Sequence, residues 1–165
     1  MKIVTYPNEL LRENIPDFDF SRTDIDPVEL EKSMIATMFA NGGIGLAANQ
    51  VGVNVRMFVM GSKELPETAQ AFFNPQVLAN TNETEDLEEG CLSFPGVFVK
   101  IKRPQKILAR WQNSKGEWQE SKFEGYDCKC FLHELDHLEG IVFKDRVSPL
   151  KWALAVKKTK KGKFK

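Results

Sequence analysis

With 165 residues, the chain has the length of a single domain that can bury one hydrophobic core. Its hydrophobic content of 42% and charged content of 28% exclude a disordered or fibrous protein. Because 23 lysine and arginine residues balance 23 aspartate and glutamate residues, the chain as a whole lacks the broad basic field that binding to DNA requires.

The sequence carries no sign of a membrane or secretory destination. No apolar run approaches the roughly 20 residues of a membrane span, and the N-terminus lacks the apolar region and cleavage site of a secretory signal. Three cysteines, an odd number, favour free thiols or a metal ligand over a disulfide framework. We therefore expect a reducing compartment, either the cytoplasm or, if a transit peptide has been removed, the stroma of a plastid or another organelle.

The first predicted helix begins after Asp26, a residue of the type that caps helices. Pro27 suits the first helical position, and apolar residues then recur at roughly helical spacing. Asn41 and Gly42 mark the end. The pattern predicts a helix that packs on the core by one face.

A glycine-rich segment follows at residues 42–52. Glycines at positions 43 and 45 allow this backbone to approach another chain or a ligand closely. A turn between a helix and a strand would also explain them. A phosphate-binding loop is a weaker alternative, because no lysine follows the glycines and no strand clearly precedes them.

The next segments predict strands and then a second helix. Residues 55–60 and 71–73 are short apolar strands, and residues 106–111 and 118–123 form a hairpin around a turn at 113–116. The second helix is expected from Asp127, as its N-cap, to Leu138, with Gly140 as the stop. Strands in runs, without regular alternation with helices, predict the α+β class.

The second predicted helix carries both histidines of the chain, in the sequence His133-Glu134-Leu135-Asp136-His137. Residues four apart lie on one helical face, so both imidazoles can reach one metal ion. Glu134 is adjacent to the first ligand, where its carboxylate can face a water molecule at the metal. The pattern indicates a metal site.

Two histidines leave a catalytic metal ion one protein ligand short. With no third histidine, the remaining candidates are a carboxylate or a cysteine. Cys91 lies in a glycine- and proline-marked segment where a thiolate could project into a site. The alternative for a cysteine, a small buried apolar residue, fits Cys128 and Cys130 better.

Two other functions are compatible with the metal motif alone. The His-Glu-x-x-His pattern also marks metallopeptidases, although no third histidine or evident downstream carboxylate ligand is present. A structural metal-binding module would need a fourth protein ligand, which Cys128 or Cys130 could supply. Glu134 and Gln50 would then have no purpose.

The C-terminal residues 157–165 form a short basic tail. A solvated, frayed terminus is the favoured interpretation. The functional alternative is a transient contact with ribosomal RNA, which would depend steeply on salt.

Three motifs occur in one order along the chain. They are Gly-x-Gly-Leu-Ala-Ala-x-Gln at residues 43–50, Glu-Gly-Cys-Leu-Ser at 89–93 and His-Glu-x-x-His at 133–137. Together they resemble peptide deformylase, and the similarity extends from the N-terminus to about Pro149. The Phe-Pro-Gly sequence at 94–96 resembles the plastid and cyanobacterial branch of the bacterial-type family.

The resemblance implies a set of roles. Cys91, His133 and His137 would bind one divalent metal ion with water in the fourth position. Glu134 would act first as general base and then as general acid. Fe²⁺ is the expected metal, and Zn²⁺, Ni²⁺ or Co²⁺ can occupy the same ligands.

Further residues would contact the substrate. The side chain of Gln50 and the backbone N–H of Leu92 would stabilise the oxyanion on the formyl oxygen. The expected substrate-binding residues are Gly43, Ile44, Gly45, Glu89 and Tyr126.

The implied reaction is metal-dependent hydrolysis of the N-formyl group from the N-terminal formyl-methionine of nascent polypeptides, which releases formate. The implied fold is α+β, with antiparallel or mixed sheets packed around a central metal-binding helix in one domain over residues 1–165. We expect a monomer whose partners are formylated nascent chains, without DNA or a membrane.

Three positions depart from the family pattern: Leu132, Phe98 and Tyr126. Phe98 stands where many bacterial members have an arginine, and Tyr126 where a smaller aliphatic residue often lines the methionine pocket. The hypothesis is that the downstream side of the substrate site is more apolar here. Arg103 and Asp136 could brace the metal helix as a pair, or Asp136 could face solvent.

Overall fold

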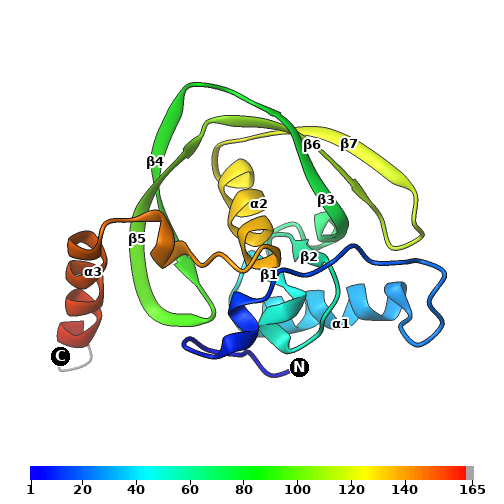
Figure 1. Cartoon of the computed structure of the whole chain (residues 1–165), viewed down its shortest axis with the longest axis horizontal. Coiled ribbons are helices and arrows are strands. Elements are labelled where there is room, and N and C mark those ends of the chain that lie inside the picture. Colours follow the sequence, from blue (N-terminus) through cyan, green and yellow to red (C-terminus); the bar gives the residue numbers. More distant parts are fainter. Residues whose placement is uncertain (163–165) are drawn as a thin grey trace.

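The structure, a computed structural model, describes residues 1–162, with side chains described for residues 1–159. Figure 1 shows helices and strands mixed along the chain, in agreement with the predicted α+β class. The helices are α1 (Pro27–Ala40), α2 (Gly125–Leu138) and α3 (Pro149–Gly162), with 3₁₀ helices η1 (Glu9–Arg12), η2 (Ala48–Val51), η3 (Pro66–Thr68) and η4 (Phe143–Arg146). The strands are β1 (Gly45–Ala47), β2 (Met57–Met60), β3 (Gln70–Asn80), β4 (Thr84–Cys91), β5 (Phe94–Pro104), β6 (Lys106–Gln112) and β7 (Trp118–Glu124).

The strands form two antiparallel sheets. In the larger sheet the order is β1-β2-β3-β6-β7, so β1 is an edge strand. In the smaller sheet β4 pairs with β5 alone among the described residues, and the ladder between them shifts register between Gly90 and Cys91. One side of β1 and one side of β4 are therefore free of strand neighbours.

Helix α2 lies between the two sheets (Figure 1). Phe131, on its buried face, contacts Phe58 of β2 and Phe72 of β3, with ring centroids 5.1 and 5.6 Å apart. Its other side faces the β4–β5 pair. This arrangement confirms the predicted central helix between antiparallel sheets.

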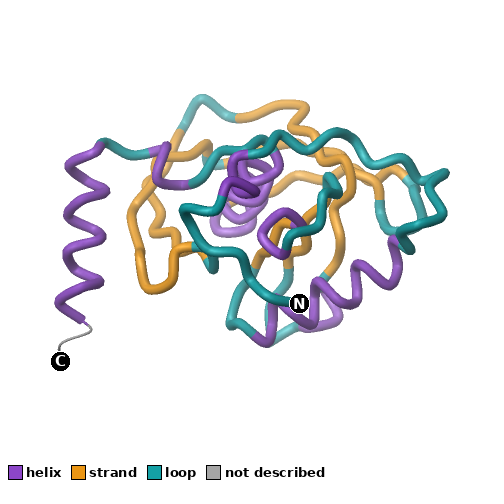
Figure 2. Tube along the Cα trace, turned by 60° about the horizontal axis from the view of Figure 1, so that its bottom comes forward, coloured by secondary structure: helices purple, strands orange, loops and turns teal. Residues whose placement is uncertain are grey.

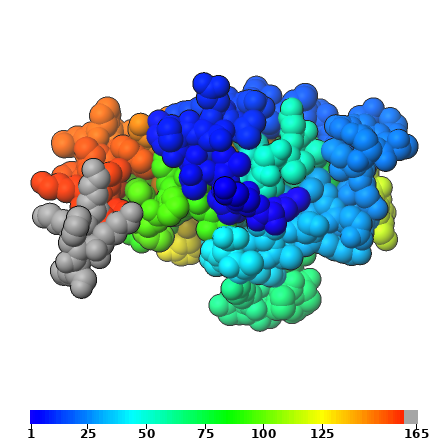
Figure 3. Space-filling model, turned by 90° about the horizontal axis from the view of Figure 1, so that it is seen from below, coloured from blue at the N-terminus to red at the C-terminus, as the bar shows by residue number. Residues whose placement is uncertain are grey.

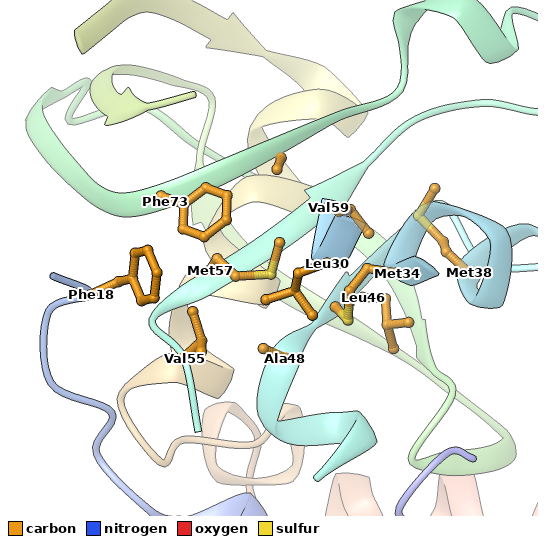
Figure 4. Packing of buried hydrophobic residues seen from close by; sticks show 11 residues of the cluster. Phe18, Leu30, Met34, Met38, Leu46, Ala48, Val55, Met57, Val59 and Phe73 are labelled. Atoms are coloured by element: carbon orange, nitrogen blue, oxygen red, sulfur yellow. The ribbon is translucent and has the colours of Figure 1, made fainter. Parts of the chain in front are cut away.

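Helix α1 packs on the opposite face of the larger sheet. The Asp26 side chain accepts hydrogen bonds from the N–H groups of Val28 and Glu29, as its predicted capping role requires. Figure 4 shows the cluster of buried side chains in which α1 packs against β1 and β2. The labelled residues are Phe18, Leu30, Met34, Met38, Leu46, Ala48, Val55, Met57, Val59 and Phe73.

Helix α3 stands at one end of the molecule, beyond β5, as Figure 2 shows. Trp152 packs its ring against Phe94 and Phe143, and Thr159 donates a hydrogen bond to the Gly96 carbonyl. The helix extends to Gly162, so much of the predicted basic tail is helical. Residues 163–165 of that tail lie outside the described residues.

The N-terminal segment covers one face between α3 and α1 (Figure 3). Val4 N–H donates to the Gln50 carbonyl at 2.7 Å, and Tyr6 N–H donates to the Ser93 carbonyl at 3.0 Å. Ile15 N–H reaches the Leu138 carbonyl at 2.8 Å. The segment therefore joins three parts of the chain that carry predicted site residues.

Three predicted boundaries were wrong. The strand expected at residues 55–60 begins at Met57. Helix α2 begins at Gly125 with Glu124 as its N-cap, so Asp127 is a residue of the first turn rather than the cap. A carboxylate there still favours the positive end of the helix. Strand β3 extends to Asn80, well beyond the predicted 71–73, because its exposed second half pairs with β6.

Among the described residues, no helix combines the length and the apolar content needed to cross a bilayer.

Candidate metal centre

The two histidines of α2 point to one place. They are four residues apart, both are buried, and their ring centroids lie 5.0 Å from each other. The third predicted ligand reaches them from the end of β4, where the register shift turns the chain toward β5. Cys91 Sγ lies 3.3 Å from His137 Nε2.

The predicted ligand set is thus assembled in space. One potential ligand atom from each of Cys91, His133 and His137 lies within 4.8 Å of the other two. A thiolate and two imidazoles suit Zn²⁺ or Fe²⁺, and three protein ligands leave an open position. The donor set therefore fits the metal that the motifs imply.

The carboxylate of Glu89 orients one of these ligands. Its side chain is 1% exposed and accepts a hydrogen bond from His133 Nδ1 at 2.8 Å. This contact keeps the proton on Nδ1 and leaves the Nε2 lone pair for a metal ion. Burial alone would raise the pKa of Glu89, but hydrogen bonds from His133 and Arg103 lower this pKa to about 2.

Glu89 was predicted to bind substrate. Its carboxylate is instead engaged by His133 and by Arg103, whose Nη2 lies 3.1 Å from Oε2. Its position on β4 still brings the residue to the wall of the cleft described below. Any contact with substrate would therefore come from its backbone.

A buried ion network continues from Glu89. Arg103 of β5 also donates to Asp136 at 3.0 Å, and Arg146 of η4 donates to the same carboxylate at 2.6 and 3.0 Å. Asp136 is buried, so the alternative that it faces solvent is wrong. The network joins β4, β5, α2 and η4 around the metal centre. The contact made by Arg146 was not predicted.

Glu134 lies beside the ligands but outside their set. Burial raises the pKa of its carboxyl to about 7. Its Oε2 atom has no hydrogen-bond partner among the described residues. A buried carboxylate oxygen left without a partner is costly, and is therefore typical of a group that meets a ligand or water.

The predicted close approach of the glycine segment is made to α2. A Cβ atom on Gly45 would lie 2.6 Å from Glu134 Oε1 and 2.7 Å from Cys130 Sγ. Only glycine allows β1 to lie this close to the helix. The carboxylate beside Gly45 would repel an anion, so the phosphate-loop alternative does not fit.

Gln50 lies on η2 with its amide directed at the ligands. Its Oε1 accepts from the Ala47 N–H at 2.9 Å, which fixes the orientation of the amide. Its Nε2 therefore points the other way, 3.1 Å from Ser93 Oγ and 3.6 Å from Cys91 Sγ. Ser93 was not predicted as a site residue.

A cleft of about 700 Å³ opens onto the centre. It lies between the glycine segment that includes β1 and the end of β4, with α2 as its floor. All the predicted site residues except His137 line it, and His137 is 1% exposed beneath it. Ile44, Phe98 and Tyr126 are exposed at its rim.

The two other cysteines are not part of the centre. Cys128 Sγ contacts the Pro104 carbonyl at 3.3 Å, and Cys130 Sγ contacts the Ile44 carbonyl at 3.7 Å. Both are buried, as predicted, and Cys130 also lines the cleft. Neither joins the cluster of potential ligands, which argues against a closed structural metal site.

Comparison with known proteins identifies the family. The family model for polypeptide deformylase matches residues 1–153. A peptide deformylase from Thermotoga petrophila is 49% identical over 132 residues, which cover 78% of this chain and 79% of the relative. These matches rule out the metallopeptidase alternative.

Solved structures agree with the sequence comparison. The crystal structure of peptide deformylase from Thermotoga maritima matches with a TM-score of 0.82 and 39% identity, covering 90% of this chain and 97% of that one. A peptide deformylase from Synechococcus elongatus, solved in complex with actinonin, matches with a TM-score of 0.86 and 31% identity over 96% and 85% of the two chains. Because the Synechococcus protein is the less similar in sequence, likeness to the cyanobacterial branch stays a prediction.

The chain therefore belongs to the peptide deformylase family, metal-dependent hydrolases that remove the N-formyl group from newly made polypeptides.

Proposed function

We propose that Cys91, His133 and His137 hold one divalent metal ion in this cleft, with Fe²⁺ as the native metal and Zn²⁺, Ni²⁺ or Co²⁺ able to replace it. The observation that carries the proposal is the convergence of three potential ligand atoms within 4.8 Å at the floor of an open cleft. Glu89 supports it by orienting His133 from behind. When bound, the metal supplies Lewis-acid activation of water and of the formyl carbonyl.

Glu134 is the proposed proton carrier. Its unpartnered Oε2 and its place beside the ligands support this role. The carboxylate takes a proton from water as the water oxygen attacks the formyl carbon. It then delivers that proton to the nitrogen as the C–N bond breaks, which leaves a free amine and formic acid; the acid then loses its remaining proton to solvent and becomes formate.

The negative charge that develops on the formyl oxygen needs hydrogen-bond donors. Gln50 Nε2 is the proposed side-chain donor, because Ala47 fixes the amide with its nitrogen toward Cys91. The backbone N–H of Leu92, the residue after the cysteine ligand, is the proposed second donor. Both groups line the cleft.

The peptide part of the substrate would bind as an extended strand. The free edges of β1 and β4 border the cleft and offer unpaired backbone groups to such a chain. The proposed substrate contacts are Gly43, Ile44, Gly45, the backbone of Glu89, and Tyr126.

The exposed apolar side chains at the rim of the cleft predict a preference for the second residue of the substrate, the one after the formylated residue. Phe98 lies across from Gly90 and its ring covers that glycine, which leaves an apolar surface at the cleft. We expect kcat/KM to be several-fold higher for formyl-Met peptides with an apolar second residue than for those with a basic one. Phe98→Arg should remove the difference, and equal values in the unaltered protein would refute the prediction.

The proposed state of the protein is a monomer that acts on formylated nascent polypeptides. The proposed location is the cytoplasm or the stroma of an organelle. A dimer seen by sedimentation equilibrium at micromolar concentration would contradict the proposed monomer.

The central test is formate release from a formyl-Met peptide by protein purified anaerobically with Fe²⁺. Cys91→Ser and Glu134→Ala should each abolish most of the activity, and only Cys91→Ser should also weaken metal retention. Cys128→Ser, at a buried cysteine outside the centre, is the matched control and should retain activity. An inactive protein that holds its metal shielded from exchange would favour a structural metal site instead.

A further inference from the structure

One charged residue in the cleft has no part in the chemistry described above. Lys129 of α2 is 9% exposed, yet its side chain lines the cleft. Its Nζ donates to the Glu88 carbonyl of β4 at 2.8 Å and lies 4.3 Å from the centroid of the Tyr126 ring. The ammonium is thus held between a carbonyl and an aromatic face.

Lys129 occupies a defined place relative to the reacting centre. It precedes His133 by four residues, so it lies on the same face of α2, about 6 Å farther along the helix axis. Cys130 and Lys129 are among the buried residues that line the cleft, whereas Ile44, Phe98 and Tyr126 are exposed at its rim.

The inference rests on the proposed function. On that function, the arrangement of buried and exposed residues in the cleft determines which part of a substrate lies near Lys129. The formyl carbon must lie beside the ligands and Glu134, and the side chain of the first residue is the nearest to it. The downstream residues leave over the rim. The first side chain therefore enters the buried part and ends near the Lys129 ammonium.

The ammonium retains hydrogen-bonding capacity. It carries three N–H donors, and the Glu88 carbonyl is the acceptor that the described residues provide. Burial lowers the pKa of Lys129, so these contacts do not replace all the solvation it has lost. An acceptor atom brought into the pocket would gain a charge-assisted hydrogen bond, while a purely hydrocarbon tip would only desolvate the charge further.

We propose that Lys129 is a specificity-determining residue that donates a hydrogen bond to an acceptor at the tip of the first side chain of the substrate. The favoured class is a formylated peptide whose first side chain is unbranched and ends near an acceptor. The thioether sulfur of methionine is a weak acceptor, and the oxygen of methionine sulfoxide is a strong one. The site then accepts N-formyl-methionine sulfoxide peptides in addition to N-formyl-methionine peptides, and discriminates against norleucine, which lacks any acceptor.

The test compares kcat/KM for three formyl tripeptides that differ only in the first residue: methionine, methionine sulfoxide and norleucine. Lys129→Met retains the length of the side chain and removes the donor. Because a hydrogen bond to a charged group is involved, the sulfoxide-to-norleucine ratio should fall about tenfold or more in this variant. Lys100→Met, an exposed lysine on β5, is the matched control and should leave the ratio unchanged.

A ratio that is the same within twofold in the unaltered protein and Lys129→Met would overturn the inference while leaving the proposed function intact. If Lys129→Met does not fold, the test is the comparison of kcat/KM for the sulfoxide and norleucine peptides with the unaltered protein. A hundredfold preference for norleucine over the sulfoxide would overturn the inference, and a preference for the sulfoxide would support it. Failure of the metal-loaded protein to hydrolyse any of the three peptides would overturn the proposed function and the inference together.

Discussion

The amide oxygen and the amide nitrogen of the Gln50 side chain make different contacts. Its oxygen is bound to the Ala47 N–H, and its nitrogen faces the thiol of Cys91. The amide is buried and fixed before any substrate arrives. Such preorganised donors stabilise a developing oxyanion without reorganisation during the reaction.

Replacement of Gln50 by alanine should therefore affect the chemical step. We expect kcat for a formyl-Met peptide to fall about 10²–10³-fold, the usual loss for one oxyanion donor. Bound metal, measured by atomic absorption, should stay near the level of the unaltered protein because Gln50 is not a ligand. A loss of less than threefold would remove Gln50 from the proposed mechanism.

Gly45 and Gly43 lie two residues apart in one segment but meet different neighbours. A Cβ on Gly45 would collide with the carboxylate of Glu134, whereas a Cβ on Gly43 would approach Leu92 Cδ1 at 2.9 Å, the far end of a flexible side chain. Gly45→Ala should destabilise the fold by about 1–3 kcal/mol and lower kcat by displacing Glu134.

Gly43→Ala is the matched control for stability, because Leu92 can rotate away at smaller cost. Urea unfolding compares the stability of the two variants, and steady-state kinetics on Gly45→Ala measures the effect on kcat. Similar losses of stability for the two variants would show that the contact with Glu134 is not the reason for glycine at position 45.

At the scale of elements, Arg103 connects strands to the metal helix. Its guanidinium lies between the buried carboxylates of Glu89 and Asp136. Arg103→Ala would leave both carboxylates without this cation, and breaking a buried ion pair in this way costs about 3–5 kcal/mol. We expect lower stability and faster loss of metal to a chelator, because Glu89 would no longer be held against His133.

Arg146→Ala is the comparison for this network. The Arg146 side chain is partly exposed and contacts Asp136 but not Glu89. Its removal should cost less stability and leave metal retention nearly unchanged. Unchanged metal retention in Arg103→Ala would contradict the bracing role.

The sequence predicts elements that depend on local chemistry. Helix α1 follows from its Asp26 cap, and the turn before β7 follows from its residues: Asn113 and Gly116 hydrogen-bond to each other, and Gly116 has a positive φ of 81°. Strand β4 could not be predicted in this way. Half of its eight residues are acidic and half are exposed, and they are extended because β5 pairs with them along their whole length.

In the candidate site, too, some features follow from local sequence and others depend on the tertiary structure. The ligands are recognisable because cysteine and histidine are rare and chemically specific. The orientation of Glu89 depends on the register of β4 against β5 and was not predicted. Lys129 did have a sequence signal, since it precedes His133 by four residues on one helix.

At the scale of the whole molecule, α3 presents a basic outer surface. Trp152, Ala155 and Val156 face the core, whereas Lys151, Lys157 and Lys158 are exposed. We propose that this surface contacts ribosomal RNA. Lys157→Glu with Lys158→Glu should abolish cosedimentation with ribosomes, and binding by the unaltered chain should weaken steeply as salt rises.

A charge reversal of equal kind far from α3 is the control for this prediction. Lys122→Glu on β7 should leave ribosome binding unchanged, and both variants should hydrolyse a short formyl peptide normally. Ribosome binding that survives the double reversal would eliminate α3 as the contact surface.

The free edges of β1 and β4 have a consequence for the breadth of the substrate range. Every polypeptide offers the same main-chain groups whatever gene encodes it, so recognition through strand edges lets a single site serve an entire proteome. Open edges also invite unwanted pairing between copies in a crowded cell. With three residues before η2 begins, β1 presents only a short edge for such pairing. The proposed recognition through strand edges would thus make one site general toward the sequences of its substrates.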